Sequence, residues 1–104
     1  MPVGLTPFDD DLWQLRLAAS ELAALQTDWA WVAGPAAGHD FRRSLNRARG
    51  ALDDARAALD AGLAPEPGWR ERAGEHMRAA RRALVRRQLA HYAPWWPAER
   101  RYLG

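Results

Sequence analysis

The chain has 104 residues, which is enough for one small domain, residues 1–104, with a single hydrophobic core. Hydrophobic residues make up 48% and charged residues 27%, a globular composition that argues against a disordered chain. The absence of cysteine excludes disulfides and thiolate-bound metals. The formal net charge is only +2. The first residues lack the basic and apolar stretches of a signal peptide, so we expect a cytoplasmic protein.

Residues 7–33 are predicted to form the first helix. Thr6 suits the N-cap and Pro7 the first helical position, and the glycine and proline at 34 and 35 end the helix. Three aspartates, at positions 9 to 11, fall in the first turns, where the helix dipole favours negative charge. Consecutive helical residues point in different directions, so we expect no metal ion on these aspartates.

This first helix has two apolar stripes when its residues are placed at about 100° intervals. One stripe consists of Leu12, Leu15, Ala18, Ala19, Leu22, Leu25 and Trp29. The other, roughly opposite, consists of Trp13, Leu17, Ser20, Ala24, Thr27 and Trp31. A helix with two apolar stripes requires a second packing partner, either within the chain or outside it. Polar and charged residues interrupt the helix, which argues against a transmembrane segment.

Two further helices are predicted, at about 40–61 and 67–92, followed by a Trp-rich tail, 93–104. The second is capped by His39 or Asp40 and carries a narrow seam of Phe41, Leu45, Ala48, Leu52, Ala55 and Leu59. The third presents a core face of Trp69, Ala73, His76, Met77, Ala80, Ala83 and Leu84. This face is rich in alanine, so we expect it to pack poorly against two tryptophans.

The third helix also carries an arginine face, formed by Arg78, Arg81, Arg82 and Arg86. Arginines neutralise phosphates and aromatic rings stack on bases, so this face and the aromatic tail predict nucleic-acid binding as one hypothesis. The alternative is a solvated helix face, because Glu71 and Glu75 lie on the same side and no known nucleic-acid-binding motif is present.

Residues 86–91, Arg-Arg-Gln-Leu-Ala-His, resemble the Arg-x4-6-His motif of HEPN domains. That family consists of small helical, usually dimeric proteins, many of them metal-independent ribonucleases. The resemblance implies that Arg86 and His91 are catalytic and meet across a dimer interface. Arg87 stands where the family usually has Asn, Asp or His. The alternative is that Arg87 is partly buried and pairs with Glu21 or Asp28.

The sequence therefore predicts an all-α fold of three antiparallel helices, as a small bundle or an extended hairpin completed by dimerisation. The leading hypothesis is a non-enzymatic interaction or assembly protein without cofactor or metal, whose partner is another copy or another helical protein. The predicted interface residues are Trp13, Leu17, Ala24, Trp31, Trp95 and Trp96. The alternative for the tryptophans is that they close the open ends of a small bundle.

Overall fold

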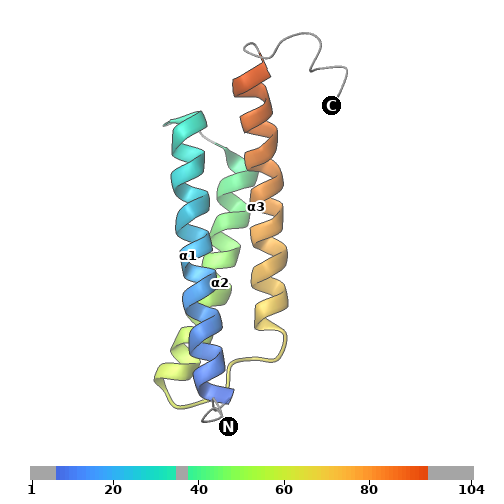
Figure 1. Ribbon diagram of the computed structural model, residues 1–104. Coiled ribbons are helices and arrows are strands. Elements are labelled where there is room, and N and C mark those ends of the chain that lie inside the picture. Colours follow the sequence, from blue (N-terminus) through green and yellow to red (C-terminus); the bar gives the residue numbers. More distant parts are fainter. Residues whose placement is uncertain (1–6, 35–37, 94–104) are drawn as a thin grey trace.

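The computed structural model describes residues 7–34 and 38–93 and places them in three helices (Figure 1). The helices are α1 (Pro7–Ala33), α2 (His39–Asp60) and α3 (Trp69–Tyr92). These bounds lie within two residues of the predicted ones. No strand occurs in the described part of the chain, so the all-α prediction is confirmed.

The end of α1 has the expected glycine cap. Gly34 adopts a positive φ of 57°, and its N–H donates to the carbonyl of Ala30 at 2.9 Å. Only glycine takes this left-handed conformation without a steric cost, which is why the helix stops there. Thr6, the predicted N-cap of α1, lies outside the described residues.

The starts of α2 and α3 differ from the prediction. The N-cap of α2 is Gly38, and no side chain caps the helix, so His39 and Asp40 are already helical residues. Helix α3 begins at Trp69 rather than near residue 67, because Gly68 before it has a left-handed φ of 83°. In both helices the N-cap residue is a glycine, and no side chain caps the helix.

The predicted faces of α2 and α3 form most of the core. All six residues of the α2 seam are buried, and so is the α3 face except for His76, which is half-buried. Ala48 and Ala80 are fully buried, and α2 and α3 make the most extensive helix–helix contact of the fold. The alanine-rich face of α3 packs mainly against α2, where small side chains let the helices approach closely, and it does not cover Trp13 or Trp31.

Helix α1 packs on the other two with one side only. Its buried residues are Leu15, Leu22, Leu25 and Val32. Ala19, which we assigned to the core stripe, is exposed. Val32, which we did not assign to that stripe, is buried near the end of the helix. Trp29 stacks on Phe41 with ring centroids 4.3 Å apart, which ties the end of α1 to the start of α2.

Cross-helix ion pairs give the relative directions of α1 and α3. Arg70 pairs with residues near the start of α1, and Arg81 pairs with Glu21 further along the same helix. The second contact lies about ten residues further along both helices than the first, so α1 and α3 run in the same direction. In Figure 1, α2 descends beside them from the end of α1 to the start of α3. Residues far apart in sequence therefore share each end of the bundle.

Candidate interaction surfaces

The second stripe of α1 is exposed along its whole length. The exposed fractions are 54% for Trp13, 49% for Leu17 and 81% for Trp31. Among the described residues no other helix covers this stripe, so α2 and α3 do not fill it. Trp95 and Trp96, the other predicted interface residues, lie outside the described residues.

Small side chains occupy the middle of this stripe. Ser20, Ala24 and Thr27 are all exposed, and the Thr27 hydroxyl donates to the carbonyl of Ala23 at 3.1 Å. The hydroxyl is thus bonded within its own helix and does not require a partner from outside. We call the six residues 13, 17, 20, 24, 27 and 31 the α1 stripe. It spans about 27 Å at a rise of about 1.5 Å per residue.

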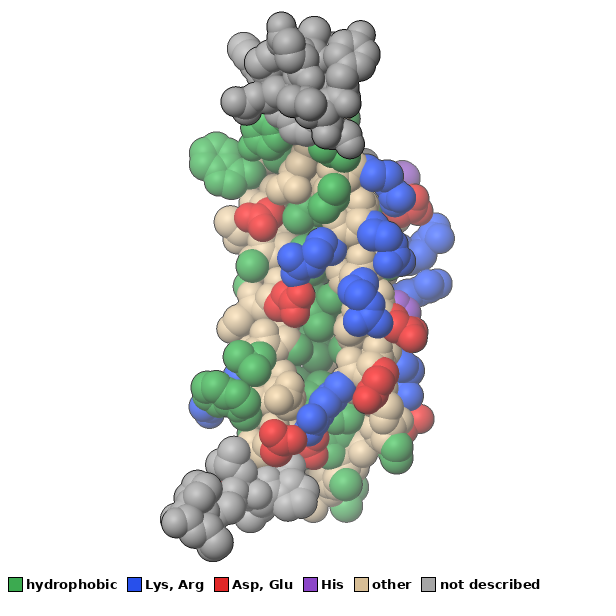
Figure 2. All heavy atoms as spheres, turned by 45° about the vertical axis from the view of Figure 1, so that its right-hand side comes forward, with side chains coloured by type: hydrophobic (Ala, Val, Ile, Leu, Met, Phe, Trp, Pro, Cys, Tyr) green, Lys and Arg blue, Asp and Glu red, His purple; other side chains and the backbone are tan. Residues whose placement is uncertain are grey.

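The α1 stripe borders a charged seam between α1 and α3. In Figure 2, acidic and basic side chains meet along the centre of the molecule, with hydrophobic side chains projecting at its left edge. Leu17 also lines a surface groove on this side, together with Trp69 and Met77 of α3. The stripe is therefore continuous with apolar surface that reaches toward the core.

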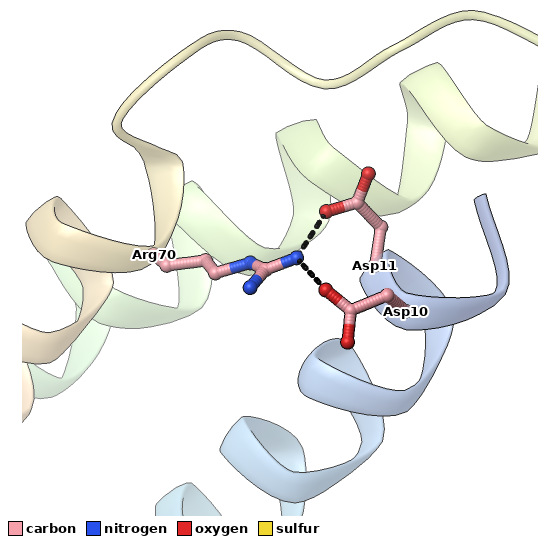
Figure 3. Close-up of polar contacts among 3 residues, drawn as sticks. All are labelled: Asp10, Asp11 and Arg70. Carbon is pink, nitrogen blue, oxygen red and sulfur yellow. Dashed lines mark hydrogen bonds and ion pairs between the residues drawn. The ribbon is translucent and has the colours of Figure 1, made fainter. Parts of the chain in front are cut away.

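One arginine holds two of the three aspartates at the start of α1 (Figure 3). Nη2 of Arg70 donates to Asp10 at 2.7 Å and to Asp11 at 2.8 Å. These two hydrogen bonds raise the pKa of Arg70 above its ordinary value, and the bond to Asp11 has the larger effect. The acidic run therefore attaches α3 to α1, in addition to its favourable position at the helix N-terminus.

The arginine face of α3 is only partly available. Arg81 donates to Glu21 at 2.5 Å and so belongs to the α1–α3 seam. Arg78, Arg82 and Arg86 are exposed, and together with Arg81 they surround Val85 in a surface depression of about 480 Å³. Val85 itself is 43% exposed. Arg87 is exposed, so the alternative of a partly buried Arg87 paired with Glu21 was wrong.

Folding separates charge between the two ends of the bundle. At the end where α1 finishes, residues 18–34, 38–49 and 78–93 hold nine arginines and three acidic residues, a net charge of +6. At the other end, residues 7–17 and 50–77 hold nine acidic residues and four arginines, a net charge of −5. We call these parts the basic end and the acidic end. The overall charge of +2 hides this polarity.

Four arginines of the basic end come from α2, and the sequence analysis missed them. They are Arg42, Arg43, Arg47 and Arg49. Averaged over its length, α2 is almost neutral, but its first half carries four arginines and one aspartate, and its second half three aspartates and one arginine. Charge counted by half-helix would have revealed this pattern. Only the fold places the arginine-rich half of α2 beside the arginines of α3.

Arg86 and His91, the pair implied by the HEPN resemblance, are both exposed near the end of α3. The ring of His91 contacts Tyr92 edge-on, with centroids 4.8 Å apart. Among the described residues, no hydrogen bond connects Arg86 with His91. The resemblance places the two residues together across a dimer interface, so the ribonuclease hypothesis stays a prediction.

A groove of about 580 Å³ between α2 and α3 brings several charged groups together. Its lining includes Asp54, Glu66, Arg72 and the half-buried His76, and Arg72 pairs with Glu66 at 3.2 Å. The lining contains no hydroxyl or thiol. Across residues 7–34 and 38–93, no group of three or more potential ligands is placed to hold a metal ion.

Comparisons with known proteins return no match among family models, curated proteins or solved structures. In the part of the chain that the structure describes, no helix is long and apolar enough to cross a membrane. Among the described residues, the exposed α1 stripe and the basic end are the two candidate interaction surfaces.

Proposed function

We propose that the protein is a non-enzymatic helical assembly protein that associates with a second copy through the α1 stripe. The observation that carries the proposal is the exposure of Trp13, Leu17 and Trp31 beside a core that is already closed. Tryptophan is enriched in the buried centres of protein interfaces, and aligned apolar side chains of this size favour burial. Dimerisation would then bury the α1 stripe, which the three-helix bundle of a single chain leaves exposed.

The mass of the protein in solution tests this proposal. We expect light scattering to give the mass of a dimer, and the double variant Trp13→Asp, Leu17→Asp to give that of a folded monomer. Ala19→Asp is the matched control, because it adds an aspartate at an exposed position of α1 away from the stripe. A wild-type chain that stays monomeric across the accessible concentrations would contradict the proposal.

Nucleic-acid binding is a second candidate, favoured by the net charge of +6 on the basic end. Exposed arginines from two helices, among them Arg47, Arg82 and Arg86, would contact phosphates. Arg81 would contribute less than predicted, because Glu21 already engages it.

A labelled RNA and a labelled DNA of mixed sequence provide the test, with fluorescence anisotropy as the readout. We expect affinity to fall steeply with salt, and the double variant Arg82→Gln, Arg86→Gln to weaken binding. Arg56→Gln is the control, since Arg56 is an exposed arginine of the acidic end. Equal losses in both variants, or no binding at low salt, would exclude the basic end as the binding surface.

A further inference from the structure

The α1 stripe is symmetric in spacing about position 22, and its end positions and its central positions also match in side-chain size. The positions equidistant from Leu22 are Trp13 with Trp31, Leu17 with Thr27, and Ser20 with Ala24. Tryptophans thus stand at both ends, and small residues lie in the middle. A symmetric stripe of this kind matches a copy of itself running in the opposite direction, with the small residues at the point of closest approach.

The charge difference between the two ends of the bundle also favours antiparallel pairing. Antiparallel pairing brings the basic end of one copy, with a net charge of +6, beside the acidic end of the other, with a net charge of −5. Parallel pairing would set the two basic ends together and the two acidic ends together. Complementary fields of this kind steer association and select one orientation over the other.

We infer that the partner of the α1 stripe is a second copy of this chain, packed antiparallel, with the two-fold axis crossing the stripe midway between Ser20 and Ala24. Trp13 then packs beside Trp31 of the other copy at each end of the contact, and Ser20 faces Ala24 at its centre. This inference rests on the proposed self-association, and it adds the orientation and the register.

Engineered cysteines read out the register directly, because the chain has no cysteine of its own. Ser20→Cys and Ala24→Cys are made as separate variants and oxidised, each alone and as an equimolar mixture. The inferred register brings position 20 of one copy within disulfide distance of position 24 of the other. We therefore expect a covalent dimer in the mixture, at least fivefold more abundant than in either variant alone.

The outcomes separate the inference from the proposal on which it rests. Strong cross-linking of each variant alone would indicate a parallel pair and overturn the inferred register, while self-association would stand. A wild-type dimer without cross-links in any sample would place the contact elsewhere and overturn both the register and the α1 stripe as the interface. A monomeric wild-type chain would overturn the proposed function itself.

Discussion

Trp31 and Trp69 form a matched pair of tryptophans with opposite surroundings. Trp31 is 81% exposed in the single chain, whereas Trp69 is 6% exposed and belongs to the core. A tryptophan side chain offers up to about 250 Å² of surface, so Trp31 buries only about 50 Å², worth about 1 kcal/mol. Trp31→Ala should therefore reduce the free energy of unfolding by about 1 kcal/mol, against about 3–5 kcal/mol for Trp69→Ala.

Self-association should show the reverse order. The exposed part of Trp31 amounts to about 200 Å² in each copy, or about 400 Å² in a dimer. If only a third of this area becomes buried, the gain is about 3 kcal/mol, which corresponds to more than about a hundredfold in Kd. Trp31→Ala should thus weaken the dimer strongly while leaving the fold almost as stable.

Two measurements separate these effects. Urea unfolding followed by circular dichroism, at concentrations where both chains are monomeric, gives the stability of the fold. Sedimentation equilibrium at higher concentrations gives the dimer Kd. If Trp31→Ala were as destabilising as Trp69→Ala and left Kd unchanged, then Trp31 would be packed within its own chain, and the reasoning from its exposure would be wrong.

Two further predictions concern the stability of the fold. Gly38→Ala should destabilise it by about 1–3 kcal/mol in urea unfolding, because a Cβ at this position would run into the indole of Trp29, which stacks on Phe41. Gly50→Ala meets open space within α2 and should stabilise by about 0.5–1 kcal/mol, so a similar loss in both variants would refute the steric explanation. Arg70→Gln should cost less than about 1 kcal/mol, and high salt should reduce that cost, because the ion pairs are exposed. The raised pKa of Arg70 contributes stability below the arginine pKa of the unfolded chain, so its full contribution is present at neutral pH; a loss that salt does not change would mean that packing, not charge, holds this contact.

The sequence was sufficient to locate the helices and two of the three core faces. Heptad spacing alone gave all six buried residues of α2 and six of the seven predicted for α3, since a residue's direction around a helix follows from its position. It was less accurate at two helix starts, since it favoured a polar cap over Gly38 for α2 and began the third helix near residue 67 rather than after Gly68. Cap choice depends on how the chain enters the helix, and tertiary contacts such as that between Gly38 and Trp29 constrain the entry.

Sequence periodicity also revealed that α1 has two apolar stripes, but it could not decide which one the chain itself would bury. That decision belongs to the tertiary structure. The alanine-rich faces of α2 and α3 approach each other closely, so α1 rests against both with one side and the stripe from Trp13 to Trp31 stays exposed. The charge polarity is likewise a property of the fold, because only the reversal of α2 brings its arginine-rich half beside the arginines of α3.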